Sequence, residues 1–308
     1  MTRREWLTTA GTVCAASVLA PRALAWQPRT RLILLGTGGG PTPKKLAAAT
    51  SQVVLVDDVP YVVDCGDGVA RQLALADVRL ATLRHVFITH QHSDHNADYG
   101  TLLLLAWAAG LKTRVDTWGP PPLERMTALS LEMNAFDIET RIADEGRVPL
   151  GPLVHAHDLT GGGVVLEDER VKVTAALVDH PPIVPAFGYR FDGPDRSIVI
   201  SGDTARSPAL ERLAQGADVL VHEAIWGPAI SQIARGVANA STLEKHLRDS
   251  HTVAEDCGRV AAAAGVKTLV LSHFVPGGDP SITDEMWSAA AGRFFKGRII
   301  VGKDLMEI

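Results

Sequence analysis

The sequence predicts an α/β domain in which two β-sheets face each other and helices cover their outer sides. Short apolar, β-branched segments occur in clusters in both halves of the 308 residues, and helical segments lie between the clusters. A set of strands in each half indicates two sheets packed face to face with helices outside. No Pro/Gly-rich linker separates the halves. We therefore expect one domain over residues 26–308.

The first half opens with an apolar strand that leads into the glycines Gly38–Gly40, where the backbone can turn tightly. Asp67 stands near the start of a predicted helix, where an acidic side chain favours the helix dipole. We expect strands within 30–43, 51–58, 61–66, 84–90 and 114–121, and helices within 67–78, 99–111 and 123–136.

The second half repeats this arrangement of strands and helices, and most of its strands end in a polar residue followed by Gly, Pro or a loop. We expect strands within 171–180, 186–191, 196–204, 218–224, 268–274 and 297–302, and helices within 208–217, 228–265 and 283–295.

The first 25 residues resemble a twin-arginine export signal rather than part of the fold. Arg3-Arg4 precede an apolar stretch over 7–20, and Ala-Leu-Ala at 23–25 fits cleavage after Ala25. The alternative is an ordinary N-terminal helix. The apolar stretch is short for a bilayer, so we expect no stable membrane anchor. The predicted location is the periplasm or the outside of the cell.

The charge balance argues against nucleic acid or an anionic membrane as a partner. Removing residues 1–25 takes away three arginines and one glutamate, leaving 27 basic and 34 acidic residues, a net charge of −7. Two cysteines remain, Cys65 and Cys257. The sequence leaves open whether they pair, and whether the chain forms a homodimer.

Seven histidines and aspartates at strand ends predict a metal centre. They are His90, His92, Asp94, His95, His180, Asp203 and His273. Imidazole and carboxylate ligands together suit Zn²⁺, with Mn²⁺ and Fe²⁺ as rivals. Seven ligands are too many for one tetrahedral ion but match two ions that share a carboxylate.

These motifs resemble the metallo-β-lactamase fold superfamily and, within it, the tRNase Z-like branch with its arylsulfatase-like relatives. The resemblance rests on H-x-H-x-D-H at 90–95, "LLGTGGGPTP", "VDCGDGVARQL", "FGYRF", "SGDT", "VHEA" and the run from His251 to Phe274. It implies an αββα sandwich and a hydrolase with two metal ions, each with its own ligands. It assigns His90, His92 and His180 to the first ion, Asp94, His95 and His273 to the second, and Asp203 to both.

The resemblance also implies three catalytic residues, Asp94, Glu223 and His251. Glu223 would pair with His251, and the histidine would protonate the leaving oxygen of an ester as a general acid. The alternative for His251 is a residue at a helix N-terminus. Asp203 makes a role in β-lactam degradation unlikely, because the resemblance places such a bridge in esterases, phosphodiesterases and nucleases.

The charge of segment 115–170 bears on the choice of substrate. The segment holds four basic and eleven acidic residues, and a negatively charged segment would repel a phosphate backbone. We therefore expect an arylsulfatase-like hydrolase of small sulfate or phosphate esters. The alternatives are a tRNA 3′-processing endoribonuclease, a lactonase and a non-catalytic metal-binding protein. Trp107, Trp118 and Trp226 are candidates for a pocket wall, although each is also typical of a core.

The remaining histidines and acids are predicted to lie outside the ligand set. His155 and His157 alternate in a segment with few other ligand types, which favours a solvated strand or loop. His85 and His246 are predicted at the surface. Asp64 and Asp67 are expected to orient metal-binding histidines.

Overall fold

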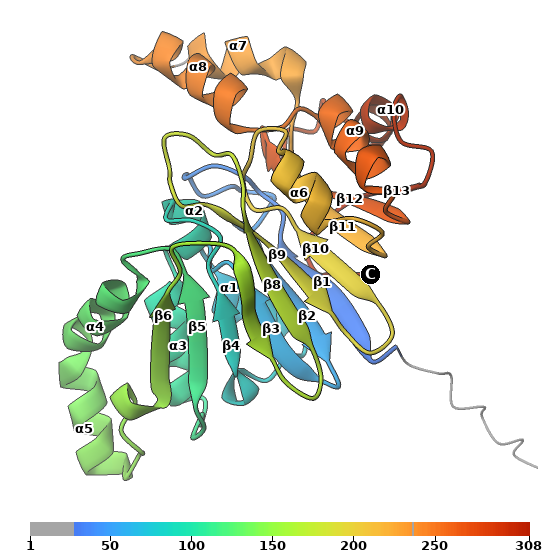
Figure 1. Cartoon of the computed structure of the whole chain (residues 1–308). Helices are drawn as coiled ribbons and strands as arrows, with labels where there is room; N and C mark the ends of the chain where they lie inside the picture. The colour runs from blue at the N-terminus through green and yellow to red at the C-terminus, as the bar shows by residue number, and fades with distance from the viewer. Residues whose placement is uncertain (1–27, 236) are drawn as a thin grey trace, which may run out of the picture.

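The computed structural model describes residues 28–235 and 237–308, and it confirms the predicted sandwich of two facing sheets (Figure 1). Each sheet has seven strands, in the orders β14-β1-β2-β3-β4-β5-β6 and β13-β12-β11-β10-β9-β8-β7. Both sheets are mixed, with antiparallel pairs toward one side and parallel pairs toward the other. The predicted export signal at 1–25 lies outside the described residues.

The strands of the two sheets come mainly from the two halves of the chain, as the sequence predicts. The first sheet contains β1 (Thr30–Gly36), β2 (Ser51–Val56), β3 (Val59–Val63), β4 (His85–Phe87), β5 (Val115–Gly119), β6 (Val154–Asp158) and β14 (Met306–Glu307). The second contains β7 (Gly163–Glu167), β8 (Lys172–Leu177), β9 (Phe187–Asp192), β10 (Ser197–Ile200), β11 (Val219–Ile225), β12 (Thr268–Val275) and β13 (Arg298–Val301).

Ten α-helices surround the sheets in the described part of the chain. They are α1 (Val69–Leu75), α2 (Ser93–Asn96), α3 (Tyr99–Ala108), α4 (Leu123–Met133), α5 (Ala135–Glu145), α6 (Pro208–Leu213), α7 (Ile230–Arg235), α8 (Ala240–Ser250), α9 (Ala254–Ala264) and α10 (Asp284–Gly292). Within the described ranges, no helix is both long and apolar enough to span a bilayer.

Side-chain alternation along the strands divides the core into three layers. Leu32 and Leu34 of β1 face the second sheet, whereas Ile33 and Leu35 face the helices α1 and α3 on the outer side. On the other outer side, α9 covers β11 and β12, α6 lies against β8 and β9, and α10 lies against β13. Burial on both faces explains why these strands read as continuous apolar runs.

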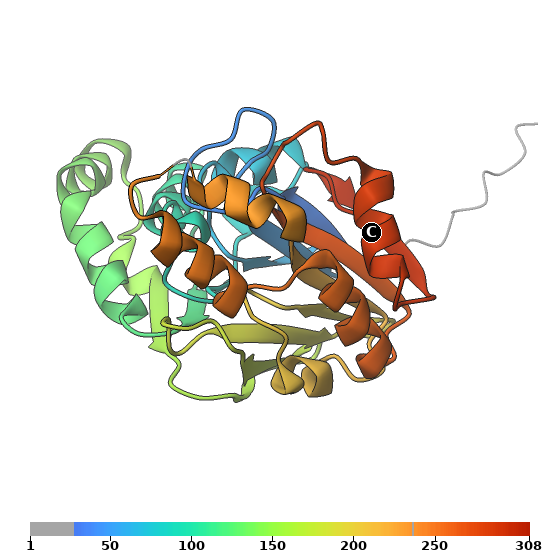
Figure 2. The ribbon, with the colours of Figure 1, turned by 90° about the horizontal axis from the view of Figure 1, so that it is seen from above.

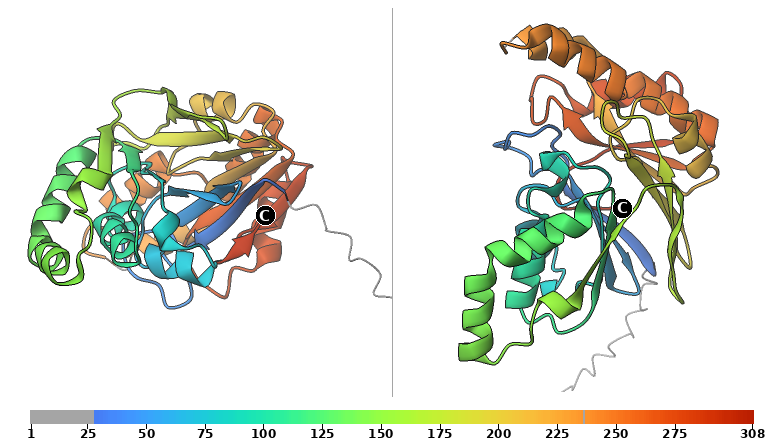
Figure 3. Two further views of the ribbon diagram at one scale, coloured as in Figure 1. Left: turned by 90° about the horizontal axis from the view of Figure 1, so that it is seen from below. Right: turned by 60° about the vertical axis from the view of Figure 1, so that its left-hand side comes forward.

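One end of the sandwich collects the polar loops that follow the strands. The loop after β4, the short helix α2 and the glycine loop after β1 meet there, and α7 and α8 stand over them (Figures 2 and 3). Loops on a rigid scaffold commonly carry function because they are exposed while their ends are held in place. This end therefore contains the candidate site.

The structure also shows elements that the sequence pattern did not predict. Strand β7 forms where no strand was expected, and β6 forms where the sequence left a strand or a loop open. Their residues are mostly half-buried or exposed, so the apolar signal is weak. The predicted helix over 123–136 ends at Met133, and a second helix begins after Asn134. The helical region 228–265 contains three α-helices, α7, α8 and α9.

Candidate metal centre

All seven predicted ligands converge at the loop end of the sandwich. His90 and His92 follow β4, Asp94 and His95 lie in α2, and the other three follow β8 and β10 or lie within β12. Six of the seven side chains are buried, and His92 is half-buried. The parallel arrangement of β10, β11 and β12 places the ends of these strands at the same edge.

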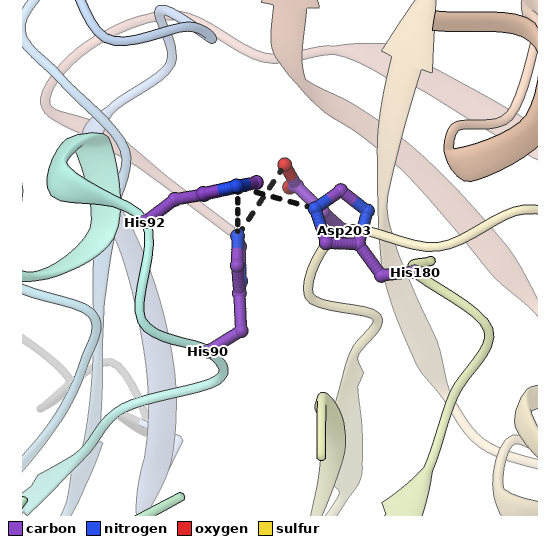
Figure 4. Close-up of side chains that lie close together, drawn as sticks. All are labelled: His90, His92, His180 and Asp203. Atoms are coloured by element: carbon purple, nitrogen blue, oxygen red, sulfur yellow. Dashed lines mark hydrogen bonds and ion pairs between the residues drawn. The ribbon is translucent and has the colours of Figure 1, made fainter. Parts of the chain in front are cut away.

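The first group consists of three histidines and one face of Asp203 (Figure 4). His92 Nδ1 lies 3.0 Å from His90 Nε2 and 3.2 Å from His180 Nε2. Asp203 Oδ2 lies 3.9 Å from His90 Nε2. Three imidazole nitrogens and a carboxylate oxygen thus point toward one another across a gap of the size that a metal ion occupies.

The second group lies on the other side of Asp203. Asp203 Oδ1 is 3.3 Å from His95 Nε2 and 3.2 Å from His273 Nε2. Asp94 Oδ2 lies 3.4 Å from His273 Nε2 and 3.8 Å from His95 Nε2. The carboxylate of Asp203 therefore presents one oxygen to each group, which is the arrangement expected of a shared ligand.

Several atoms of this cluster are buried without a hydrogen bond to any other described residue. They include His95 Nε2, His273 Nε2 and Asp203 Oδ1. Buried polar atoms are nearly always hydrogen-bonded, so buried atoms without a hydrogen bond need another partner. Imidazole nitrogens and carboxylate oxygens are the ligands that Zn²⁺ prefers in proteins. The side chains present therefore fit a centre for divalent metal ions.

Hydrogen bonds from outside the ligand set fix the orientation of two histidine rings. Asp64 Oδ2 accepts from His95 Nδ1 at 2.8 Å, and Asp64 Oδ1 accepts from the Thr89 backbone N–H at 2.8 Å. The Ser250 carbonyl accepts from His180 Nδ1 at 2.8 Å. In both rings Nε2 is left facing the centre, which is how proteins commonly orient metal-binding histidines. The expected contact between Asp64 and a candidate ligand histidine is confirmed.

The glycine loop after β1 is adapted to this centre. A Cβ on Gly39 would lie 2.6 Å from the His273 ring, so only glycine fits beside that ligand. The Gly40 N–H donates to Asp94 Oδ2 at 2.8 Å. His273 and Asp64 both have positive φ angles, 47° and 61°, which are uncommon for residues other than glycine. Such backbone conformations cluster at functional sites.

The electrostatics differ between the two groups of side chains. Burial lowers the pKa of His90 well below its usual value and that of His180 to about 4. Burial alone would raise the pKa of Asp203, but the neighbouring His273 and His95 outweigh it and hold that pKa well below the usual range. His90, His180 and Asp203 are thus in the protonation states that bind a cation.

In the second group burial lowers the pKa of His95 and His273, but the Asp203 carboxylate, with Asp64 beside His95 and Asp94 beside His273, outweighs it and raises both pKa values. His95 and His273 would therefore release a proton on binding a cation.

Glu223 and His251 form the predicted pair beside the metal ligands. His251 Nδ1 lies 2.9 Å from Glu223 Oε2, and Glu223 Oε1 accepts from the Thr204 N–H at 2.7 Å. Burial lowers the pKa of His251, but the adjacent Glu223 carboxylate outweighs it and raises the pKa to about 9. The ring also lies close to the centre, with Nδ1 3.7 Å from Asp203 Oδ2. His251 can therefore hold a proton next to the metal ligands.

An apolar cleft of about 510 Å³ opens from the metal centre toward α7 and α8. Its lining includes His92 and His251, together with His246 and aliphatic side chains of α7, α8 and the end of β12. The prediction that His246 lies at the surface is therefore wrong, because α8 folds back over the ligands. This residue is the site feature that sequence reasoning missed.

The other sequence predictions for this region are resolved by burial and contacts. None of the three candidate tryptophans lines the cleft. Trp107 is buried in a cluster with Ile138 of α5, and Trp226 packs against Trp287. Asp67 is exposed and contacts no ligand, so its expected orienting role is wrong. Cys65 and Cys257 are both buried and free.

Three further histidines lie in the first sheet, His85 on β4 and His155 and His157 on β6, away from the ligands. His157 on β6 pairs with Asp116 at 2.8 Å, so the strand-face interpretation of the His155–His157 alternation holds. His85, predicted at the surface, is instead largely buried between Tyr61 and Trp118. Pairing of β4 with β3 and β5 places it there.

Comparison with known proteins shows where this chain belongs. The profile of the family described as Beta-lactamase superfamily domain matches residues 60–274. Ribonuclease Z of Mycobacterium bovis BCG is 34% identical over 280 residues, covering 90% of this chain and 97% of the relative. Ribonuclease Z of Mycobacterium tuberculosis is 32% identical over the same share of each chain.

Solved structures agree on the fold. Human tRNase Z, short form, superposes with a TM-score of 0.66 at 21% identity, covering 90% of this chain and 98% of the other. A metallo-β-lactamase fold protein from Bacillus subtilis gives 0.65 at 19% identity, covering 91% and 98%.

Fold and site together define a metal-dependent hydrolase that acts on ester bonds, of the metallo-β-lactamase superfamily. Within that superfamily the chain belongs to the tRNase Z-like branch, beside the ribonucleases Z.

Two sequence predictions are thereby overturned. The leading expectation, an arylsulfatase-like hydrolase for small esters, is wrong. The expectation that nucleic acid is not a partner is wrong as well. Both are overturned because the relatives that match nine tenths of this chain are ribonucleases. Both predictions failed because the net charge of the chain was used to judge the charge at the site. The acidic segment 115–170 instead forms β5 to β7 with α4 and α5, and α5 lies toward the other end of the molecule (Figure 1).

Proposed function

We propose that this protein is a two-metal ribonuclease that hydrolyses phosphodiester bonds in RNA, as the ribonucleases Z related to it do. The observation that carries the proposal is Asp203, whose two carboxylate oxygens face two separate groups of ligand atoms. The sequence relationship to ribonucleases Z over 90% of the chain supports RNA as the substrate.

In this proposal His90, His92 and His180 hold one Zn²⁺, Asp94, His95 and His273 hold the other, and Asp203 bridges them. When bound, the two ions would supply a water that deprotonates near neutral pH and positive charge for the phosphate oxygens. The burial of six of the seven side chains supports this assignment, because buried nitrogen and oxygen atoms need partners.

His251 supplies the proton that the leaving oxygen requires. Its Nδ1 is engaged by Glu223, so Nε2 is the nitrogen that faces the cleft. The Glu223 carboxylate orients the ring and stabilises its protonated form, which makes His251 a general acid. Asp94 acts as a ligand and is fixed by the Gly40 N–H.

The test is cleavage of a precursor tRNA that carries a 3′ extension, with Zn²⁺-loaded protein at physiological salt. We expect cleavage by the wild type and a loss of at least 100-fold in the Asp203→Ala variant, with less bound metal by elemental analysis. Asp67→Ala is the matched control, because Asp67 is exposed and touches no ligand. A wild-type protein that binds two ions but leaves the RNA intact would refute the proposal.

We also propose that residues 1–25 direct export by the twin-arginine route. The paired arginines, the apolar stretch and Ala-Leu-Ala support this. Changing Arg3 and Arg4 to lysine should leave unprocessed precursor inside the cell, as judged by fractionation and immunoblotting. Mature protein that still accumulates outside the inner membrane would contradict the export proposal.

A further inference from the structure

His246 lines the cleft beside the metal ligands, although neither the proposed ligand set nor the Glu223–His251 pair includes it. Nitrogen atoms of His180, His246 and His251 lie within 4.8 Å of one another. The His246 ring centroid is 5.3 Å from that of His251, with the two ring planes nearly perpendicular. A group held between these two rings would contact both.

The hydrogen bonds around His246 determine which nitrogen carries the proton in the neutral ring. The Ser250 hydroxyl donates its single proton to the Pro181 carbonyl. It must therefore accept from His246 Nδ1, which lies 3.2 Å away. His246 Nε2 has no hydrogen-bond partner among residues 28–235 and 237–308. The ring therefore offers the cleft a hydrogen-bond acceptor at Nε2.

The rest of the cleft suits an uncharged flat group rather than further phosphates. Ile233, Leu243, Leu247 and Val275 line it. Its only Lys or Arg side chain among the described residues is Lys44, whose ammonium is bonded to oxygens of its own loop. Its volume of about 510 Å³ lies in the range of roughly 300–1,000 Å³ typical of pockets for one small ligand. A single nucleoside fits this description.

We propose that the cleft between α8 and the metal centre holds the ribonucleoside whose 3′ oxygen leaves, and that His246 Nε2 accepts a hydrogen bond from its 2′-hydroxyl. The 2′ and 3′ oxygens sit on adjacent ribose carbons, and His246 and His251 sit side by side. His251 thus protonates the 3′ oxygen while His246 binds the adjacent 2′-hydroxyl. This inference rests on the proposed ribonuclease function.

The bond changes are those of an ordinary hydrolysis. Water attacks phosphorus and loses one proton to solvent, the P–O3′ bond breaks, and its electron pair stays on the 3′ oxygen. That oxygen takes the proton from His251 Nε2, and His251 regains a proton from solvent. The products are a fragment with a free 3′-hydroxyl and a fragment with a 5′-phosphate. His246 exchanges no proton with the substrate, so it is a positioning and selectivity residue. The 2′-hydroxyl is the group by which a protein distinguishes RNA from DNA.

The experiment compares four versions of one cleavable RNA that differ only at the nucleotide whose 3′ oxygen leaves: ribo, 2′-deoxy, 2′-fluoro and 2′-O-methyl. The 2′-fluoro sugar is the key probe, because it remains electron-withdrawing but cannot donate a hydrogen bond. We expect kcat/KM of the Zn²⁺-loaded wild type to fall about 10-fold for both deoxy and fluoro substrates, as one lost hydrogen bond predicts. His246→Phe should cleave ribo, deoxy and fluoro substrates with nearly equal efficiency.

Two controls separate this inference from the proposed function. Lys245→Gln changes an exposed neighbour on α8 and should retain the full 2′-hydroxyl preference. Bis(p-nitrophenyl) phosphate, which has no ribose, reports hydrolysis by the wild type independently of any 2′-hydroxyl contact, and the metal content of His246→Phe should equal that of the wild type. RNA cleavage by the wild type without a 2′-hydroxyl preference, or a preference that survives in His246→Phe, overturns the inference alone. Hydrolysis of the nitrophenyl diester without any RNA cleavage overturns both proposals.

Discussion

At the scale of single residues, Glu223 determines what His251 can do. The carboxylate holds Nδ1 of the ring at 2.9 Å and raises the pKa of His251 to about 9 against the opposing effect of burial. An unpaired histidine in the same place would be neutral and could not donate a proton at pH 7. In the proposed mechanism, the pair makes a proton available to the leaving oxygen.

This role predicts a dependence on the leaving group. His251→Ala should slow hydrolysis of alkyl or ribonucleoside phosphodiesters by about 10²–10⁴-fold, the usual contribution of general acid catalysis. It should slow nitrophenyl diesters much less, because nitrophenolate leaves without a proton. The measurement is kcat/KM across a series of leaving groups, with metal content as the control. Equal slowing across the series, or loss of metal, would assign His251 a structural or ligand role instead.

At the scale of elements, strand pairing places an isolated histidine between two aromatic side chains. β4 has only three residues, yet it lies between β3 and β5, so His85 stacks on Tyr61 at 4.7 Å and on Trp118 at 5.5 Å between ring centroids. Burial lowers the pKa of His85 to about 4 from the ordinary 6.5. The folded protein thus holds this ring in its neutral form.

The sign of the resulting pH dependence follows from linkage. A depressed folded-state pKa means that the unfolded chain binds the proton first, so stability is intact above pH 6.5 and falls between pH 6.5 and about 4. His85→Phe keeps an aromatic ring in the stack and removes the titration. Between pH 7 and pH 4.5 the wild type should lose about 2 kcal/mol more unfolding free energy than this variant. Urea unfolding at both pH values measures the difference, and parallel losses would contradict it.

At the scale of the whole molecule, the candidate metal centre brings together parts of the chain that are far apart in sequence. His90, His92, Asp94 and His95 are attached to the first sheet, whereas His180, Asp203 and His273 are attached to the second. Ions bound between them would link the two layers of the sandwich. Because the unfolded chain has no preformed site, metal affinity adds to folding stability.

Removal of metal should therefore destabilise the entire fold. Free Zn²⁺ at a hundred times its Kd stabilises by about 2.7 kcal/mol, which corresponds to roughly 5–10 °C in Tm for a domain of this size. Thermal unfolding with Zn²⁺ and after chelation should show this shift in the wild type. The shift should largely vanish in Asp203→Ala and persist in Asp67→Ala. An unchanged wild-type Tm after complete chelation would contradict the link between metal and fold.

The sequence alone determined the two-sheet fold and the cluster of His and Asp side chains at strand ends, because apolar periodicity and the residues after each strand are local properties. It could not place His246 or His85, since their burial depends on α8 folding over the centre and on β3 and β5 flanking β4. It also misjudged the substrate, because net charge is a sum over the chain and says nothing about where charges lie. Only the tertiary structure decided which nitrogen of each histidine faces the centre, since partners such as Asp64 and Ser250 are distant in sequence.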